Sequence, residues 1–185
     1  MGARSLASLL VGLAGLVSAY GGISLQPHES TYTLEGIKLR QLGFFDGGKE
    51  ITYQQPPDWS YSGTSDRLIL HPPGKSQAEA IISRASANEG AKENATPLAE
   101  ATASAPQGST DLRIISQAEN SVKINGKESF QVVMTYNLQG QTFSRSIVFL
   151  NRDHEQLRFQ LTTREGDFKD LNRAFQGSLC TWQNL

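Results

Sequence analysis

Histidine and cysteine, the residue types that most often bind transition metals, are scarce in this chain. Its three histidines are His28, His71 and His154, and its one cysteine is Cys180. None of the histidines forms an i, i+4 pair or neighbours the cysteine, so the ligand spacing of a metal site is missing. The carboxylates on either side of His154 do not change this, because adjacent residues in a tight turn point apart. We therefore expect no metal and no cofactor.

The sequence also lacks the common motifs of nucleophilic catalysis and phosphate binding. No Gly-x-Ser-x-Gly elbow occurs. Cys180 could pair with a distant histidine in space, but it ends a predicted amphipathic helix, where burial is the ordinary outcome. The glycine-rich segment Asp46–Gly48 lacks the Gly-Lys-Ser/Thr of a phosphate loop and is typical of a hairpin turn. We expect that the protein is not an enzyme.

Three side chains remain as candidates for ligand binding. Arg145 shares strand parity with apolar neighbours, so it points toward an apolar face, where a guanidinium either pairs structurally or anchors a ligand. Trp59 and Tyr61 follow two prolines and could form an exposed aromatic patch, although packing beneath a loop is the more common outcome for aromatic residues. These three residues are the weak candidates that the sequence offers for a binding site.

Composition excludes several further classes of protein. The 185 residues carry 17 Lys and Arg against 18 Asp and Glu, a net charge of −1, so the surplus of cations that binds nucleic acid is absent. One cysteine allows neither an intramolecular disulfide framework nor a cysteine-rich zinc or iron–sulfur site. The length fits one domain with additional segments.

Residues 1–19 have the pattern of a secretory signal peptide. Arg4 supplies the positive region, an apolar run covers Leu6–Val17, and small residues precede a predicted cut between Ala19 and Tyr20. A retained membrane helix is the alternative, but the run of about 12 residues is short of the roughly 20 that a span needs. The junction has no cysteine for a lipid anchor. We predict a secreted or periplasmic protein without an integral membrane span after cleavage. We also expect that Cys180 is buried or, alternatively, that it forms an intermolecular disulfide.

The first half of the mature chain is typical of short strands. Alternation in 37–42, the turn at Asp46–Gly48 and the run 50–53 predict a β-hairpin, and 67–71 predicts a further strand. The segment that follows is ambiguous. Ser76 and Glu79 have the spacing of a capping box and favour a helix from Ser76 to about Asn88, whereas alternation over Ala78–Ser83 favours a strand.

The C-terminal half has the clearest periodicity. Period-2 alternation predicts strands around 112–115, 130–138, 143–149 and 157–161, which are joined by tight turns into an antiparallel meander. Asp167 is expected to cap a closing helix that lies across the sheet. Its predicted inner positions are Phe168, Leu171, Ala174, Phe175, Ser178 and Leu179. The order of elements predicts an α+β fold, an antiparallel sheet with helical cover.

Over roughly residues 51–182 this pattern resembles a known superfamily of compact α/β/α sandwiches, which includes the photosystem PsbP proteins and the periplasmic DcrB proteins of bacteria. The matching features are the hairpin at Asn125–Lys127, the segments Tyr136–Gly140, Arg145–Leu150 and Leu157–Phe159, the closing helix and tail over Phe168–Trp182, and, upstream, Pro57–Trp59 and Leu68–Pro73. The resemblance implies that Ala78–Ser83 is a strand, which we favour, and that the helix lies at about Pro97–Ser104. It transfers no functional residue.

The resemblance further implies an exported bacterial protein that acts as a binding or assembly module. We expect a signal peptide at 1–19, an N-terminal extension with a β-hairpin at 20–50 and the PsbP/DcrB-like domain at 51–185. We predict a non-catalytic module that binds a protein partner of the cell envelope and no nucleic acid. The alternatives are a small-ligand carrier that uses the sheet as a floor, and a small hydrolase whose residues meet only in space.

Overall fold

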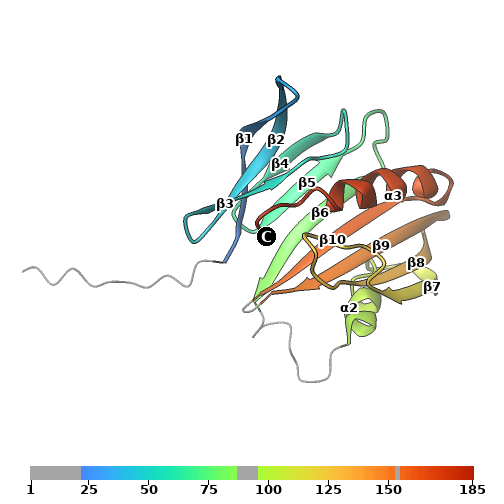
Figure 1. The fold of residues 1–185 in the computed structure, drawn as a ribbon. Helices are drawn as coiled ribbons and strands as arrows, with labels where there is room; N and C mark the ends of the chain where they lie inside the picture. The colour runs from blue at the N-terminus through green and yellow to red at the C-terminus, as the bar shows by residue number, and fades with distance from the viewer. Residues whose placement is uncertain (1–21, 87–95, 153–154) are drawn as a thin grey trace, which may run out of the picture.

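A computed structural model describes residues 22–86, 96–152 and 155–185, so the predicted signal peptide, its cleavage site and His154 lie outside the described residues. The described chain forms two antiparallel sheets and two helices (Figure 1). The smaller sheet has the order β1-β2-β3 and consists of β1 (Ser24–Leu34), β2 (Ile37–Asp46) and β3 (Lys49–Tyr53). The hairpin predicted around Asp46–Gly48 is confirmed, and Gly47 and Gly48 have the positive φ that this turn requires.

The larger sheet has seven strands in the order β4-β5-β6-β10-β9-β8-β7. Its last four strands in the chain form the predicted meander, in which each pair is antiparallel. The strands are β4 (Ser60–Gly63), β5 (Arg67–His71), β6 (Glu79–Ser86), β7 (Thr110–Glu119), β8 (Phe130–Leu138), β9 (Gln141–Asn151) and β10 (Glu155–Arg164).

The two helices cover opposite faces of the larger sheet. α3 (Glu165–Leu179) packs on β9 and β10, and α2 (Pro97–Ala103) packs on β8 from the other side. The interior strand β9 is buried continuously from Ser144 to Leu150, because its alternate residues face one helix layer and then the other. The predicted α+β class, a sheet between helical layers, is thus confirmed, and the predicted helix at about Pro97–Ser104 is α2.

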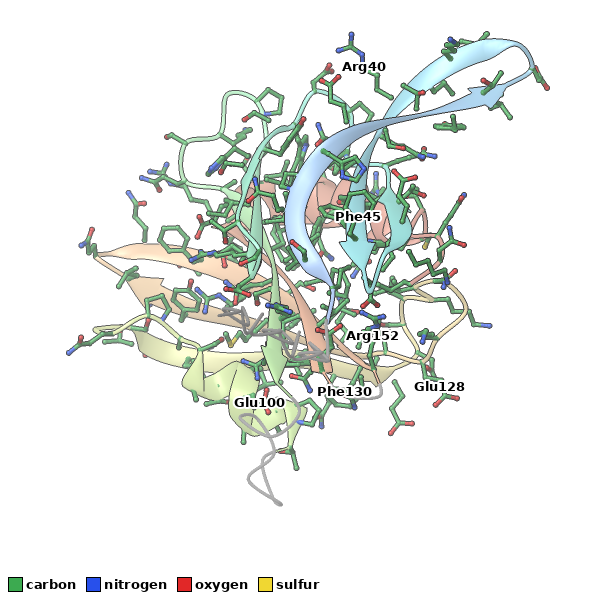
Figure 2. All side chains as sticks on the ribbon, turned by 90° about the vertical axis from the view of Figure 1, so that its left-hand side faces the viewer. Arg40, Phe45, Glu100, Glu128, Phe130 and Arg152 are labelled. Carbon is green, nitrogen blue, oxygen red and sulfur yellow. The ribbon has the colours of Figure 1, made fainter. Side chains whose placement is uncertain are left out.

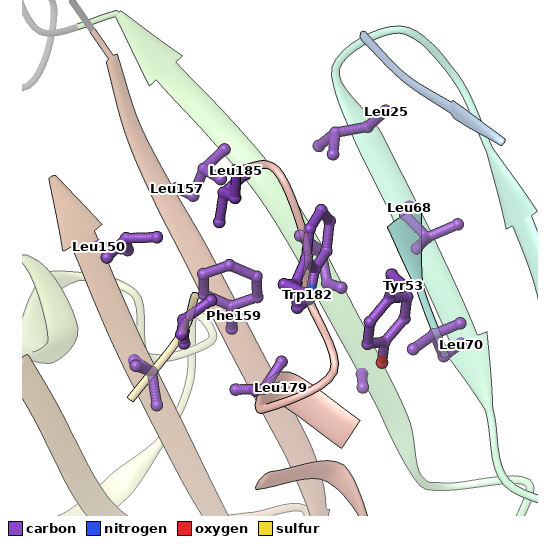
Figure 3. Close-up of a cluster of buried hydrophobic side chains, with 14 of the residues drawn as sticks. Leu25, Tyr53, Leu68, Leu70, Leu150, Leu157, Phe159, Leu179, Trp182 and Leu185 are labelled. Atoms are coloured by element: carbon purple, nitrogen blue, oxygen red, sulfur yellow. The ribbon is translucent and has the colours of Figure 1, made fainter. Parts of the chain in front are cut away.

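The main core lies between α3, the larger sheet and the smaller sheet. Trp182, which follows α3, stands at its centre (Figure 3). Its ring is stacked 4.9 Å from that of Tyr53 and 5.3 Å from that of Phe44, and the edge of Phe159 meets it at 5.7 Å. Gln183 then pairs with Thr52 of β3, so the C-terminal tail extends the smaller sheet. The predicted boundary between the N-terminal extension, 20–50, and the domain, 51–185, consequently falls inside β3. Residues on both sides of this boundary contribute to one core.

The capping-box interpretation of Ser76 is wrong, and the strand that we favoured is present. β6 pairs with β5 on one side and β10 on the other. Ala80 and Ile82 enter the main core, while Ile81 faces the α2 side. A central strand that carries apolar residues on both faces has them at i, i+3 and i+4, which mimics a helical stripe.

Three predictions about the closing helix need correction. α3 begins at Glu165 without a side-chain cap, and Asp167 lies in its first turn, where its carboxylate accepts a hydrogen bond from Lys75 Nζ at 2.7 Å. Ala174 is exposed, although Phe175, Ser178 and Leu179 are buried as expected. Cys180 is exposed as well, because it is the C-cap residue and lies outside the buried stripe.

Candidate functional site

A two-stranded arm projects from the smaller sheet. β3 pairs with β2 only from Leu42 to Asp46, so among the described strands the part of β2 before Leu42 pairs with β1 alone. We call residues 28–41 the arm. Figure 2 shows the arm reaching beyond the rest of the molecule, with Arg40 on it and Phe45 near its base. Its tip is a two-residue turn in which Glu35 and Gly36 both have positive φ, the geometry of a tight type I′ hairpin.

The strand register gives the arm two different faces. Residues directly opposite each other in an antiparallel pair point to the same side. Leu34 is opposite Ile37 and Tyr32 is opposite Leu39, so these four residues form one face, the apolar face of the arm. Thr31, Thr33, Lys38 and Arg40 occupy the other face. The exposed fractions of Leu34 and Ile37 are 56% and 63%, values that are unusual for large aliphatic residues.

The base of the arm is fixed by His28 of β1. Its ring is stacked on that of Phe45 with centroids 4.7 Å apart, and its Nε2 lies 3.0 Å from Glu50 Oε1. The ring lies across Gly43, its partner in the register, where a Cβ would come within 2.3 Å of His28 Nε2. His28 is therefore a structural residue of the arm.

Arg145, the arginine singled out by strand parity, lies on the α2 face of β9 and is only 6% exposed. Its Nε donates to Thr162 Oγ1 at 2.9 Å, its Nη1 to the carbonyl of Ser104 and to Ser104 Oγ at 3.2 Å, and its Nη2 to Tyr136 Oη at 3.2 Å. The guanidinium carbon lies 5.3 Å from the centroid of the Tyr136 ring. These contacts join the sheet to the end of α2.

A surface hollow of about 350 Å³ adjoins Arg145, which we call the Arg145 pocket. Tyr136, Leu138 and Phe143 supply apolar surface to it. Its polar lining includes His71, Ser76, Gln77, Glu79 and Thr162. Burial lowers the pKa of Arg145 and raises that of Tyr136, because both charged forms would be poorly solvated there.

The structure separates the two aromatic candidates. Trp59 is buried against α3, with its ring parallel to that of Phe175 and the centroids 6.3 Å apart. Tyr61 lies on the edge strand β4 and is 38% exposed. Neither lines the Arg145 pocket. Packing, the more common outcome for aromatic residues, is thus found for Trp59, and the alternative of an exposed patch of both rings is not formed. Trp59 precedes β4, whereas Tyr61 lies within this edge strand.

In the described part of the chain, His, Cys, Asp and Glu side chains do not gather into a group of three that could hold a metal ion. Within that same part, neither helix has the length and apolar character of a membrane span. Cys180 lines an open surface hollow together with Lys169 and Arg173. The histidines His28 and His71 do not line this hollow.

The comparisons with known proteins concern structure alone. No protein-family model matches the chain, and no curated protein is significantly similar to it in sequence. Among solved structures, a protein of unknown function from Pseudomonas aeruginosa is 19% identical with a TM-score of 0.45, over 83% of this chain and 95% of that one. A protein from Bacteroides thetaiotaomicron is 13% identical with a TM-score of 0.47, over 72% of this chain and 44% of that one.

The solved structures that match also include the cyanobacterial PsbP of Synechocystis sp. PCC 6803. It is 10% identical with a TM-score of 0.46, over 94% of this chain and 98% of that one. The chain is thus similar in structure to a PsbP protein, as the sequence pattern implied. At these identities and TM-scores the similarity is one of fold, and we draw nothing about function from it.

Sequence reasoning found Arg145 but missed the arm. The signal for the arm was present, because Leu34-Glu-Gly-Ile37 places a glycine-containing pair between two runs of β-forming residues. A local pattern does not show that no third strand among the described residues covers the arm, since this depends on where β3 ends in the assembled sheet.

Proposed function

We propose that this protein is an exported, non-catalytic module that binds a protein partner through the apolar face of the arm. The observation that carries the proposal is the exposure of Leu34 and Ile37 on a ribbon that no third strand of the described residues joins. Apolar side chains gathered on a projecting element usually mark an interaction site. A partner that covers this face would bury Tyr32 and Leu39 as well. Export rests on the pattern of residues 1–19.

The fixed base of the arm supports the same proposal. Arm residues 28–41 are stabilised by one strand pair, and an isolated two-stranded hairpin is only marginally stable in water. The His28–Phe45 stack and the contact of His28 with Glu50 hold its base in one orientation. A partner would therefore meet an arm that is already directed away from the body, which lowers the entropic cost of binding.

Site-specific photo-crosslinking in the native host tests this proposal. With p-benzoylphenylalanine at position 37, we expect one discrete protein adduct, and with the crosslinker at Lys169, an exposed residue of α3, we expect none. Adding Leu34→Asp to the position-37 protein should decrease the adduct several-fold, because a carboxylate would be desolvated at the interface. Equal labelling from both positions, or an adduct with lipid in place of protein, would contradict the proposal.

The hydrolase alternative requires groups that act on one another. The Arg145 pocket does bring His71 and Ser76 to one hollow. Both are exposed, however, and within the described residues no hydrogen bond joins His71 to Ser76 or Glu79. Since a nucleophile is normally activated by a base within hydrogen-bond reach, this arrangement favours binding over catalysis.

The carrier alternative requires an apolar cavity. On the α3 side of the larger sheet, the space is filled by the main core around Trp182. On the α2 side, a second hollow of about 210 Å³ is lined by Arg67, Glu100 and Arg158 as well as by Ile147 and Phe149. Mixed linings of this kind suit a small polar ligand better than a lipid.

A further inference from the structure

Arg145 carries a positive charge in a place where water reaches it poorly. It is 6% exposed, and among the described residues no carboxylate lies within 4.0 Å of its guanidinium. Its hydrogen-bond partners Thr162, Ser104 and Tyr136 are all neutral. A buried guanidinium is normally paired with an anion, because desolvation of the charge is costly. The hydrogen-bond partners supply dipoles to the guanidinium, and no carboxylate of the described residues is in contact with it.

One N–H group of Arg145 makes no hydrogen bond to the described residues and is free to bind a ligand. A guanidinium has five N–H groups. Nε uses its one for Thr162, and Nη1 uses two for the carbonyl and the hydroxyl of Ser104. Nη2 donates once, to Tyr136, so its second N–H has no acceptor among the described residues. Arg145 also lines the Arg145 pocket, where a ligand could accept from this group.

The opposite side of the pocket carries a negative charge. The register places Glu79 beside Thr162 and Thr162 beside Arg145, in one row across β6, β10 and β9. Neighbouring strands are about 4.8 Å apart, so the two Cα atoms are roughly 10 Å apart on the same face. Glu79 makes no ion pair within the described residues and lines the pocket with Arg145.

The presence of both charges decides which ligand fits. A simple anion such as phosphate would be attracted by Arg145 and repelled by Glu79. A zwitterion satisfies both, with its carboxylate on Arg145 and its ammonium on Glu79. One part of the remaining wall is apolar, since the rings of Tyr136 and Phe143 are stacked with centroids 6.0 Å apart and Leu138 also lines the pocket. His71, Ser76 and Gln77 line another part and are polar.

We infer that the Arg145 pocket binds a small zwitterion with an apolar side chain, of the class of free amino acids such as phenylalanine or leucine. The pocket volume of about 350 Å³ is at the lower end of the range for small-molecule sites and suits a ligand of this size. This site is formed by the larger sheet, by the segment between β5 and β6, and by Pro106, which follows α2. It uses no residue of the arm, so it does not depend on the proposed function.

Titration of the protein with L-phenylalanine, followed by two-dimensional NMR, tests the inference. We expect saturable shifts at Thr162, Tyr136 and Glu79. 3-Phenylpropanoate, which lacks the ammonium group, and phenethylamine, which lacks the carboxylate, should each bind more weakly. No saturable shift with L-phenylalanine, or equal affinity for 3-phenylpropanoate, would overturn the assignment.

Two charge-removing variants separate binding from stability. Arg145→Gln should raise the Kd for L-phenylalanine about tenfold or more, since a charge-assisted hydrogen bond is lost. Glu79→Gln should raise the Kd for L-phenylalanine and lower the Kd for 3-phenylpropanoate. Glu79 makes no ion pair among the described residues, so this variant should fold even if Arg145→Gln does not. An unchanged order of affinities in Glu79→Gln would refute the proposal.

Discussion

Tyr53 illustrates how one buried hydroxyl group is satisfied in this core. Its Oη lies 2.8 Å from Ser178 Oγ, and Ser178 Oγ in turn donates to the carbonyl of Phe175 at 2.6 Å. The serine proton is thus used by the helix, and the tyrosine donates to the serine oxygen. A tyrosinate at this position would have no proton to donate to Ser178, and no water would reach it to solvate its charge. Burial therefore raises the pKa of Tyr53 far above its ordinary value.

This shift predicts a loss of stability at high pH. In the unfolded chain Tyr53 ionises near pH 10, whereas in the folded chain it stays protonated, so the stabilisation is complete below about pH 10 and is lost as the pH rises further. The free energy of unfolding should fall by up to about 1.4 kcal/mol per pH unit from this residue. Urea unfolding at pH 8, 10 and 11 measures this decrease in the free energy of unfolding.

Tyr53→Phe is the matched variant for this prediction. At pH 8 it should cost about 1 kcal/mol, the net value of a hydrogen bond, and its stability should decrease less steeply above pH 10 than that of the wild type. Some decrease remains, because burial also raises the pKa of Tyr136. Identical slopes in the two proteins would show that Tyr53 is accessible to hydroxide in the folded state.

At the level of elements, β1 is held to the larger sheet by a close approach at Gly63. A Cβ at this position would lie 2.6 Å from Pro27 Cδ and 3.0 Å from the carbonyl oxygen of Leu25. Leu25 N also donates to the carbonyl of Ser65 at 2.8 Å. Glycine is therefore required at position 63 because the backbone of β1 passes directly above it.

Gly63→Ala should consequently displace β1 and lower the free energy of unfolding by about 1–3 kcal/mol, the usual cost of overpacking. Gly177→Ala is the matched control, since no atom outside its own helix backbone would lie within 4 Å of the new Cβ. There, in the last turn of α3, alanine should stabilise the protein by about 0.5–1 kcal/mol. Denaturant unfolding compares the two, and equal effects would refute the close-approach argument.

The elements also show why some local signals were misleading. The capping-box spacing of Ser76 and Glu79 is compatible with a helix, but β5 and β10 offer hydrogen-bond partners on both sides of this segment. A strand in that central position satisfies its backbone and buries Ala80 and Ile82 in the main core. Tertiary pairing therefore overrides the local preference.

At the level of the whole molecule, one arginine joins the two sheets. Arg152, in the turn between β9 and β10, contacts Asp46 at the end of β2 and lies 2.5 Å from Glu155. Glu155 also accepts from the backbone N–H of Ile23 at 3.2 Å, just before β1. All three charged side chains are less than a quarter exposed. This network ties one end of the smaller sheet, where β1 begins beside the end of β2, to one turn of the larger sheet.

Arg152→Ala should leave two carboxylates without a counter-charge and cost about 2–3 kcal/mol, somewhat below the 3–5 kcal/mol of a fully buried pair. Lys75→Ala, which breaks the more exposed pair with Asp167, should cost at most about 1 kcal/mol. Thermal unfolding of both variants measures the difference. If Arg152→Ala were as mild as Lys75→Ala, the network would not be what joins the sheets.

Period-2 alternation by itself determined most of the meander, the β2–β3 hairpin and the direction in which Arg145 points, because these depend on the regular geometry of strands and turns. The amphipathic pattern of the closing helix determined its buried side, with Ala174 as the exception. Strand parity could give a face but not the partners on it, and Ser104 is 41 residues from Arg145 in the chain.

Only the tertiary structure decided which strands lie side by side and where pairing stops. β6 is a strand because β5 and β10 flank it, and the arm is exposed because β3 ends at Tyr53 and the tail joins it there. Glu79 and Arg145 share a pocket because β10 lies between their strands. Each of these outcomes depends on long-range pairing, whose free energy is not encoded in any single stretch of sequence.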